Sequence, residues 1–347
     1  MNEDTTMDRT LDSLADALRQ EKRVLITCHV KPDGDAIGSL IAMHRAMSSL
    51  GADSVMYLAD DNPVAPEFRW LPGLSEARFG SPPADHASRT LISVDCGSAE
   101  RIGNDELVVA ASRIINIDHH GDNTRFGKLN LVVAGASSTA EILYFVLRKM
   151  GVEISGEIGE ALYTGILVDS GRFQYSSASA TTFRVAADLI ARGVDHTEIF
   201  RKVYETVPLA KSRLLCRLLT NMTIACGGRL AVGLLDQEDF ESAGAGNGFT
   251  EGLVDNLRAI EGVQVAALIY ARPSGSVEPG HQDEQEGKTL YRVSLRSSSE
   301  ELDVQKIAGA KGGGGHKQAA GFTAEGETSE EIIAFLVESV SRAIEED

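Results

Sequence analysis

Long apolar runs are missing from this chain. The longest uncharged stretch, Leu129 to Ala140, is well short of the roughly 18 to 20 apolar residues that a membrane-spanning helix needs. The N-terminus carries Glu3, Asp4 and Asp8, whereas a secretory signal begins with positive charge followed by an apolar segment. The sequence therefore predicts no membrane span and no export signal, and we expect a cytoplasmic protein that does not act at a membrane.

Cysteine is also scarce. The chain contains Cys28, Cys96, Cys216 and Cys226, and no two of them form a Cys-x-x-Cys pair. This spacing matches neither a disulfide framework nor a structural zinc cluster. We interpret all four as small buried hydrophobic side chains.

Positive charge is in the minority. Lys and Arg number 33 against 51 Asp and Glu, which gives a formal net charge of −18. Proteins that wrap long duplex DNA or lie on an anionic membrane need clustered cations, so this balance argues against both. A short nucleotide stays open as a ligand, because a few cations or a bound metal could hold it. At about 150 residues per domain, the length predicts two domains.

An alternation of β-rich and helical segments is present in the first half. Strands are predicted over 23–28, 54–58, 90–94 and 113–117, and helices over 8–19, 138–150, 158–168, 180–192 and 195–217, the last with a break near Pro208. The strands are nearly continuous in Val, Ile and Leu, as expected of parallel strands that are covered on both faces. This order predicts an α/β layer fold with a parallel sheet.

A second set of elements begins near Thr223. Strands are predicted over 230–235, 263–270 and 289–295, and helices over 252–260 and 329–344. The segment 272–288 is rich in Gly, Pro, Glu and Gln, and we interpret it as a protruding solvated loop. We therefore expect a catalytic domain over 1–205, a helical linker over 206–222 and a second domain over 223–347.

His29, Asp33 and Asp35 cluster in one turn after the first predicted strand. Pro32 and Gly34 let the backbone bend sharply there, so the two carboxylates can reach neighbouring points in space. By itself, Asp-Gly-Asp is common in turns and helix caps. This cluster alone leaves both interpretations open.

Three further apolar runs end in the same residue types. Asp95 follows one strand, Asp118 is followed by His119 and His120 after another, and Asp169 follows an apolar helical run. Each carboxylate alone would be interpreted as a cap or turn residue. Four such ends that contribute only His and Asp are hard to explain as caps, and ligands bind at this edge of open parallel sheets.

These residue types favour one class of ion. Carboxylates with a few imidazoles and no thiolate suit Mn²⁺ or Mg²⁺ better than structural Zn²⁺, although affinity order alone leaves zinc and cobalt open. We expect two Mn²⁺ ions, with Mg²⁺ or Co²⁺ as alternatives. Two ions about 3.5 to 4 Å apart can activate a water between them and stabilise both oxygens in phosphoryl transfer. Such a pair needs a shared carboxylate, and Asp95 is our candidate.

The order of these residues resembles a known family. His29-x-x-x-Asp33-x-Asp35, Asp95, Asp118-His119-His120 and Asp169 are similar to the four motifs of the DHH phosphoesterase superfamily. The segment 311–322, KGGGGHKQAAGF, resembles the glycine-rich signature of the DHHA1 substrate domain. The resemblance implies an N-terminal parallel-sheet DHH domain, a smaller C-terminal α/β DHHA1 domain and an active site in the cleft between them.

The resemblance also implies a role for each motif residue. His29 and Asp33 would hold the first ion, Asp35, His119 and Asp169 would hold the second, and Asp95 would bridge them. A hydroxide between the ions would attack phosphorus.

Two motif residues would act beside the ions. By the same resemblance, His120 would contact the scissile phosphate or assist the leaving group, and Asp118 would orient His119. These assignments make Asp95, Asp118 and His120 the candidate catalytic residues.

The glycine-rich segment has a structural interpretation and a functional one. Composition alone allows a flexible surface loop, but cations flank the glycines, and glycine lets backbone amides approach a phosphate closely. The resemblance implies that the distal part of a nucleotide is bound by Gly313, Gly314, Gly315, His316 and Arg296.

Other branches of the superfamily fit less well. The pyrophosphatases lack the Gly-Gly-Gly-His signature, the long exonucleases need a basic channel, and the membrane phosphodiesterases need spanning segments. The resemblance therefore implies a compact nanoRNase-type enzyme, a homodimer that hydrolyses short oligoribonucleotides to mononucleotides and 3′-phosphoadenosine 5′-phosphate (pAp) to AMP and phosphate. The alternative is a stand-alone phosphodiesterase that acts on cyclic di-AMP or linear pApA. A nucleotide-binding module without catalysis and a generic metal-dependent phosphatase are two further hypotheses.

Overall fold

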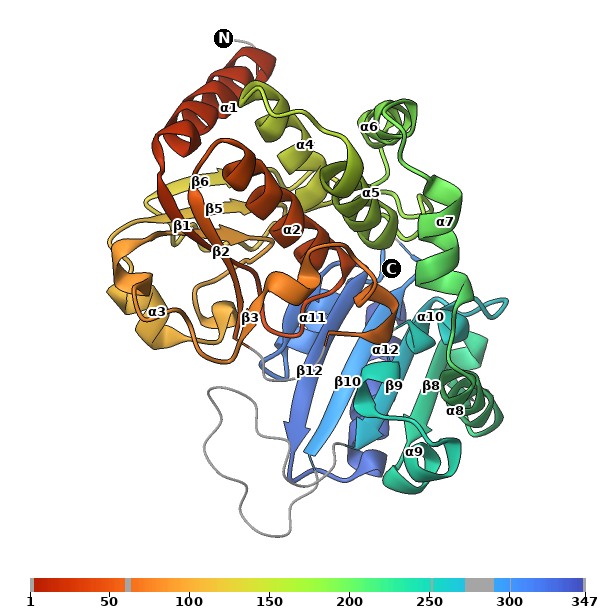
Figure 1. Ribbon diagram of the computed structural model, residues 1–347. Helices are drawn as coiled ribbons and strands as arrows, with labels where there is room; N and C mark the ends of the chain where they lie inside the picture. The colour runs from red at the N-terminus through yellow and green to blue at the C-terminus, as the bar shows by residue number, and fades with distance from the viewer. Residues whose placement is uncertain (1–2, 60–63, 251, 272–289, 300, 346–347) are drawn as a thin grey trace. The chain divides into compact units, whose positions relative to one another are not determined.

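The chain folds into two compact units, and the boundary between them lies between Thr206 and Val207 (Figure 1). The structure, a computed structural model, describes residues 3–59, 64–250, 252–271, 290–299 and 301–345. Among these residues, the helices are all too short or too polar to cross a membrane. The predicted protruding loop 272–288 lies outside the described residues.

In the described part of the first unit, six parallel strands form a sheet in the order β3-β2-β1-β4-β5-β6. The strands are β1 (Arg23–Thr27), β2 (Asp53–Leu58), β3 (Arg78–Phe79), β4 (Thr90–Val94), β5 (Ile114–Asp118) and β6 (Leu129–Val132). The predictions for β1, β2, β4 and β5 are confirmed to within one residue at each end. Sequence analysis missed β3 and β6, which are short and lie at the two edges of the sheet, where little apolar side chain has to be buried.

Helices cover both faces of this sheet. They are α1 (Glu3–Gln20), α2 (Gly34–Ser49), α3 (Asp105–Ala110), α4 (Thr139–Lys149), α5 (Gly156–Asp169), α6 (Ala180–Ala191) and α7 (His196–Phe200), which continues as a π-helical turn over Arg201–Glu205. Val24 and Ile26 of β1 belong to the core that α1, α2, α4 and α5 build, whereas Leu25 packs with Leu107 of α3 on the opposite face. This two-sided burial explains the unbroken apolar runs, and the α/β prediction is confirmed.

Helices α2 and α5 pack unusually closely. A Cβ added at Gly38 of α2 would lie 2.3 Å from the Ala161 carbonyl oxygen of α5, so glycine is required at this contact. The close approach brings the first turn of α2, with Asp35, toward α5, which ends at Asp169. Two predicted site residues that are far apart in sequence therefore meet at the carboxyl edge of the sheet.

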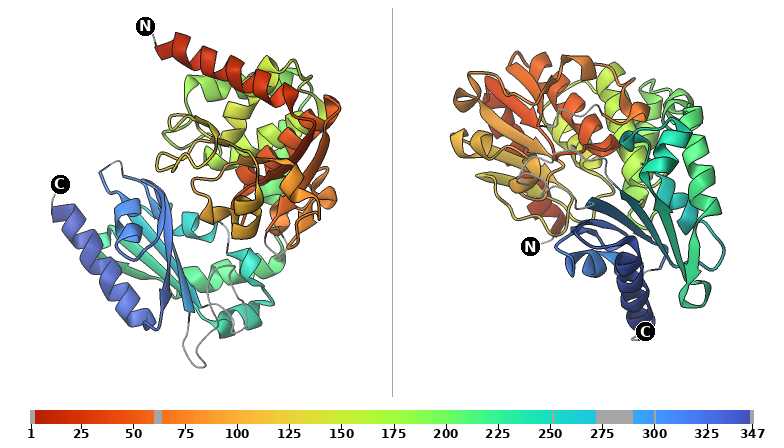
Figure 2. Two further views of the ribbon diagram at one scale, coloured as in Figure 1. Left: turned by 90° about the vertical axis from the view of Figure 1, so that its left-hand side faces the viewer. Right: turned by 90° about the horizontal axis from the view of Figure 1, so that it is seen from below.

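The described part of the second unit has a mixed sheet in the order β11-β12-β10-β9-β8-β7, in which β8 and β9 are parallel and the other pairs antiparallel. Its strands are β7 (Thr223–Ala225), β8 (Leu230–Leu235), β9 (Val265–Ala271), β10 (Leu290–Ser297), β11 (Gly314–His316) and β12 (Ala319–Glu325). Its helices are α8 (Leu209–Thr220), α9 (Gln237–Ala243), α10 (Leu253–Arg258), α11 (Val304–Gly309) and α12 (Ser329–Glu345). Helices α11 and α12 cover one face of this sheet (Figure 2), and α8, α9 and α10 cover the other.

These elements test two predictions for the second half of the chain, the helix break near Pro208 and the conformation of the segment 311–322. The predicted break near Pro208 is confirmed, because Pro208 is the N-cap residue of α8. The flexible-loop alternative for 311–322, which composition alone allowed, does not hold for the parts that form β11 and the start of β12. Glycine and alanine have low strand propensity, so the pairing of β12 with β10 and β11, and not local preference, makes this segment extended.

The cysteines differ in exposure. Cys28 and Cys96 are buried, Cys226 is half-buried and Cys216 of α8 is exposed. Our interpretation of four buried thiols is therefore wrong for Cys216. Burial raises the pKa of the Cys96 thiol to about 12, which keeps it unreactive at neutral pH.

Candidate metal centre

The predicted site residues of the first unit gather where β1, β4 and β5 end. The chain runs outward from β1 to β2 and β3, and then crosses back to β4 and continues outward on the other side. The gap between β1 and β4 is therefore the switch point at which open α/β sheets bind ligands.

His29, Asp33 and Asp95 form the first set of candidate ligands. Each offers one nitrogen or oxygen atom, and these atoms lie within 4.8 Å of one another. The His29 Nδ1–H donates to the Val30 carbonyl at 2.8 Å, and His29 Nε2 lies 3.5 Å from Asp95 Oδ2. Because a carbonyl can only accept, Nδ1 carries the proton and Nε2 is the nitrogen suited to bind an ion.

Asp33 has two tasks in this set. Its Oδ1 accepts hydrogen bonds from the backbone N–H groups of Asp35 (2.9 Å) and Ala36 (3.0 Å) and so caps α2. The cap fixes the side chain at the start of the helix. The capping and the ligand interpretations of Asp-Gly-Asp are therefore compatible.

Asp35, His119 and Asp169 form the second ligand set, with ligand atoms again within 4.8 Å of one another. His119 Nε2 lies 3.2 Å from Asp169 Oδ2. The Asp35 carboxylate accepts hydrogen bonds from the N–H groups of Thr139 (2.7 Å) and Ala140 (3.0 Å) at the start of α4. Three elements, α2, α4 and α5, therefore converge on this set.

Asp95 lies between the two sets. Its Oδ2 lies 3.5 Å from His29 Nε2, and its Oδ1 lies 3.5 Å from His119 Nε2. The side chain is 2 % exposed, and the backbone has a φ of 53°, in the left-handed region that non-glycine residues seldom adopt. One carboxylate thus directs one oxygen toward each set.

Several of these groups have pKa values far from the ordinary range. Burial, with the charges of Asp95 and Asp169, holds the pKa of Asp35 well above its usual value. Burial raises the pKa of Asp169 to about 6. Burial alone would lower the pKa of His119, but the charges of Asp169, Asp95 and Asp35 raise it to about 9. Carboxylates this crowded are stabilised by a divalent cation, so the donor atoms and the electrostatics both fit a cation site.

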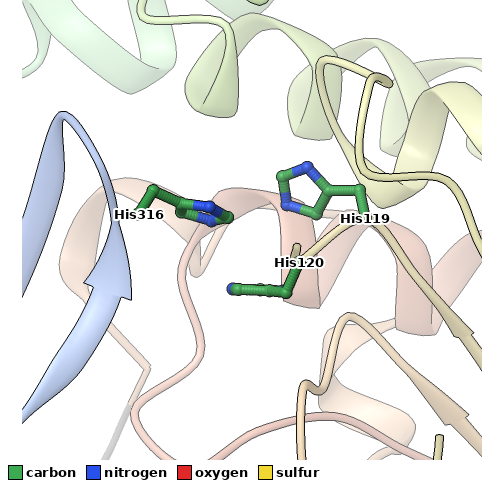
Figure 3. Close-up of side chains that lie close together, drawn as sticks. All are labelled: His119, His120 and His316. Carbon is green, nitrogen blue, oxygen red and sulfur yellow. The ribbon is translucent and has the colours of Figure 1, made fainter. Parts of the chain in front are cut away.

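Asp118 and His120 form a separate pair beside the first two sets. His120 Nδ1 lies 2.8 Å from Asp118 Oδ1, and the His119 and His120 rings meet edge to face with centroids 4.9 Å apart (Figure 3). We expected Asp118 to orient His119. The structure joins it to His120 instead, and His119 Nδ1 lies 3.4 Å from the Ala136 carbonyl oxygen. Neighbouring residues in this turn point in different directions, so Asp118 reaches the second imidazole and not the first.

Thr139 was not among the predicted site residues. Its Oγ1 donates to Asp95 Oδ1 at 3.0 Å while its N–H donates to Asp35, so one buried residue contacts the carboxylates of both sets. The sequence holds a partial signal next to it, since the pattern Ser138-x-x-Glu141 is typical of a capping box. Ser138 does accept from the Glu141 N–H, but the Glu141 carboxylate accepts from Ser137 and Thr182.

The predicted substrate residues of the second unit lie near one another in its sheet. Arg296 of β10 and His316 of β11 both pair in register with Ala319 of β12, one on each side. A Cβ at Gly313 would lie 2.2 Å from the Gly321 carbonyl oxygen and one at Gly315 would lie 2.5 Å from that of Ala319, whereas Gly314 faces open space. Strand packing therefore explains Gly313 and Gly315 but not Gly314.

This combination of fold and site defines a class of protein. The chain matches the family model for the N-terminal domain of the DHH family over residues 23–166 and that for the DHHA1 domain over residues 241–346. It belongs to the DHH family and is a phosphoesterase, a hydrolase. The resemblance found in the sequence is confirmed.

The chain is similar to two curated relatives and to one solved structure. The chain is 32% identical over 329 residues to the bifunctional oligoribonuclease and PAP phosphatase NrnA of Thermus thermophilus. The aligned region covers 93% of this chain and 92% of that protein. It is 25% identical to the cyclic-di-AMP phosphodiesterase PdeA of Listeria monocytogenes over 94% of this chain but 49% of that protein. An exopolyphosphatase-related protein from Bacteroides fragilis shares the fold, with a TM-score of 0.83, 24% identity and 96% coverage of both chains.

Proposed function

We propose that this protein is a manganese-dependent phosphoesterase that hydrolyses short oligoribonucleotides to mononucleotides and pAp to AMP and phosphate. The observation that carries the proposal is the position of Asp95, whose two oxygens face two separate ligand sets. A shared carboxylate of this kind is what a pair of ions in phosphoryl transfer requires. The similarity to a bifunctional oligoribonuclease and PAP phosphatase over nearly the whole chain supports this choice of substrates.

The donor atoms support manganese. In the proposal, His29 and Asp33 hold one ion, Asp35, His119 and Asp169 hold the other, and Asp95 bridges them. Oxygen and imidazole donors without thiolate suit Mn²⁺, and Mg²⁺ or Co²⁺ could replace it. When bound, the ions would supply a shared hydroxide as nucleophile and positive charge next to the phosphoryl oxygens.

Residues of the chain would handle the proton and the substrate. Asp118 holds His120 through Nδ1, so a proton would pass from His120 Nε2 to the leaving oxygen as the P–O bond breaks. Arg296, His316 and the backbone of 313–315 would bind the distal part of the nucleotide in the second unit. The proposal keeps 1–205 as the DHH domain, 206–222 as the linker and 223–347 as the DHHA1 domain.

A substrate panel tests the proposal. Purified protein with Mn²⁺ is assayed on short RNAs, pAp, pApA and cyclic di-AMP, with the Asp95→Asn variant as control. Asn keeps the side-chain shape and tolerates the left-handed backbone, so this variant removes charge with the least disturbance. We expect turnover of short RNA and pAp that the variant loses by at least about 1,000-fold. Equal product from variant and wild type would disprove the enzyme proposal.

The alternative substrates are cyclic di-AMP and linear pApA. The similarity to a cyclic-di-AMP phosphodiesterase favours this second candidate. A kcat/KM for cyclic di-AMP well above that for pAp and short RNA in the same panel would replace the first proposal by the second.

The cytoplasmic location and the homodimer stay predictions. Cell fractionation tests the first. Analytical ultracentrifugation of the full chain tests the second, since a dimer would sediment at twice the protomer mass.

A further inference from the structure

A series of hydrogen-bonded side chains leads from His120 into the sheet. Asp118 is fully buried; its Oδ1 meets His120 Nδ1 at 2.8 Å, and its Oδ2 accepts from Asn123 Nδ2 at 2.6 Å. The same Asn123 Nδ2 donates its second hydrogen to Asn116 Oδ1 at 2.8 Å, and the Cys96 carbonyl oxygen lies 3.2 Å from it. His120 is thus connected through Asp118 to the interior of the sheet.

The orientation of the Asn123 amide is fixed by its other end. The Arg125 N–H donates to Asn123 Oδ1 at 2.6 Å, and a backbone N–H can only donate. The Asn123 oxygen must therefore face Arg125, and its NH₂ must face Asp118. A rotated amide would place its oxygen against the Asp118 carboxylate.

Asn116 anchors the end of this series of hydrogen bonds that lies inside the sheet. It lies in the middle of β5 and is fully buried, and its own Nδ2 donates to the Cys96 carbonyl at 3.1 Å. Because Asn116 lies on a strand that is paired on both sides, it fixes the position of Asn123, and Asn123 in turn fixes Asp118. Hydrogen-bond partners of this kind orient the imidazole that they reach.

We propose that Asn123 is a positioning residue that locks the Asp118–His120 pair for proton transfer to the leaving oxygen. The inference rests on the proposed function and deepens it. In the step, the nucleophile bonds to phosphorus, the P–O bond to the leaving group breaks, and the proton on His120 Nε2 moves to the departing oxygen. Asn123 touches neither phosphorus nor substrate and acts through Asp118.

A purely structural role for Asn123 predicts something different. Asn123 also stabilises the turn at Arg125, whose φ is 53°. Loss of the turn alone would slow every substrate alike or lower stability. Loss of proton delivery would slow only those substrates whose leaving oxygen needs a proton.

Two diester substrates that contain AMP distinguish the positioning role of Asn123 from a purely structural role. Linear pApA releases a ribose hydroxyl, which needs a proton, whereas the p-nitrophenyl ester of AMP releases nitrophenolate, which departs without one. Asn123→Asp keeps the acceptor for Arg125 and removes the donor to Asp118, and Asn123→Ala removes both. Asn130→Ala is the matched control, because Asn130 also holds a turn through its amide, with Gly127 as partner.

We expect both Asn123 variants to lower kcat on pApA by about 10- to 100-fold and kcat on the nitrophenyl ester by less than about 3-fold, with KM nearly unchanged. Mn²⁺ affinity measured by calorimetry should stay within about 3-fold of wild type, because Asn123 bonds to none of the six proposed ligands. Asn130→Ala should leave both rates unchanged.

Three results would overturn the inference. Equal losses on the two diesters would assign Asn123 a structural role, and so would a drop in Mn²⁺ affinity as large as the drop in kcat. Unchanged kcat on pApA in both variants would show that Asn123 is dispensable. If wild-type protein turns over neither these diesters nor short RNA and pAp, the proposed function fails and the inference fails with it, whereas active wild type with equal losses disproves the inference alone.

Discussion

At Asp95, backbone and side chain serve the site together. The left-handed backbone at this residue costs about 1 to 3 kcal/mol outside glycine, and the surrounding fold has to compensate for it. In return, the turn after β4 directs one carboxylate oxygen toward each ligand set. Aspartate suits the position because short polar side chains tolerate this conformation best.

A substitution at Thr139 tests whether its contacts with Asp35 and Asp95 position the two candidate ligand sets for metal binding. Thr139→Val keeps the shape and the backbone N–H but removes the Oγ1 donor to Asp95. We expect Mn²⁺ affinity, measured by calorimetry, to fall by about 10-fold, since partners of metal ligands contribute 10- to 100-fold. Thr139→Ser keeps the hydroxyl and should restore most of the affinity. Equal affinity in the valine and serine variants would contradict the role.

The raised pKa of His119 predicts that metal binding releases protons. With a pKa of about 9, the metal-free imidazole is protonated at pH 7.5, whereas a ligating imidazole must be neutral at the binding nitrogen. Mn²⁺ binding at about pH 7.5 should therefore release the proton of His119, in addition to protons that the raised pKa holds on Asp35, and affinity should rise with pH until about 9.

At acid pH a second group adds to this effect. Asp169, with a pKa of about 6, also holds a proton below that value, so affinity should fall more steeply there. Calorimetry in buffers of different ionisation enthalpy counts the protons. A pH-independent affinity between 6 and 9 would contradict the assignment.

The clustering of the proposed ligand residues could be predicted from sequence, but the residues that support them could not. His29, Asp33, Asp35 and Asp95 each follow a strand that the apolar pattern reveals, so their common edge follows from the parallel sheet. The partner of Asp118 depends on side-chain directions within one turn. Thr139 and Asn123 resemble ordinary cap and turn residues, and only tertiary contacts distinguish them.

Among the elements, the contact between α2 and α5 matters most for the site. Gly38→Ala would place a methyl group 2.3 Å from the Ala161 carbonyl oxygen, and the helices would have to separate. We expect a loss of about 1 to 3 kcal/mol in the free energy of unfolding, together with weaker Mn²⁺ binding because Asp35 lies one turn earlier on α2.

Urea unfolding and calorimetry measure the two effects of Gly38→Ala. Gly135→Ala is the control, since a Cβ at Gly135 meets nothing within 4 Å. A Gly38→Ala protein as stable as wild type would show that the helices adjust at no cost.

The elements that sequence analysis missed share a physical cause. The β12 segment begins Ala-Ala-Gly, which carries no strand signal, and its extended form depends on partners on both sides. Helices α9 and α11 are short and begin at Asp caps that also occur in turns. The long helices α1, α4, α5, α6 and α12 and the apolar strands were predicted because burial alone specifies them.

At the scale of the whole molecule, each unit has hydrophobic clusters of its own. All six proposed metal ligands lie in the first unit, Met1–Thr206. We therefore expect residues 1–206 alone to unfold cooperatively and to bind Mn²⁺ within about 3-fold of the affinity of the full chain.

The same fragment should process nucleotides poorly. Without Arg296 and the segment 313–316 it lacks the groups proposed to hold the distal phosphate, so KM for pAp should rise by at least about 10-fold. Circular dichroism, calorimetry and steady-state kinetics check these outcomes. A fragment with full affinity for pAp would remove the second unit from the proposed substrate site.

The distribution of thiols makes this protein convenient for spectroscopy. Cys216 stands exposed on α8 of the second unit, while Cys28 and Cys96 are buried and Cys226 is half-buried against Ser341 of α12. A nitroxide reagent would therefore react first at Cys216 without any mutation. If Mn²⁺ occupies the proposed site, electron spin resonance would measure the distance between the ion and a label on Cys216.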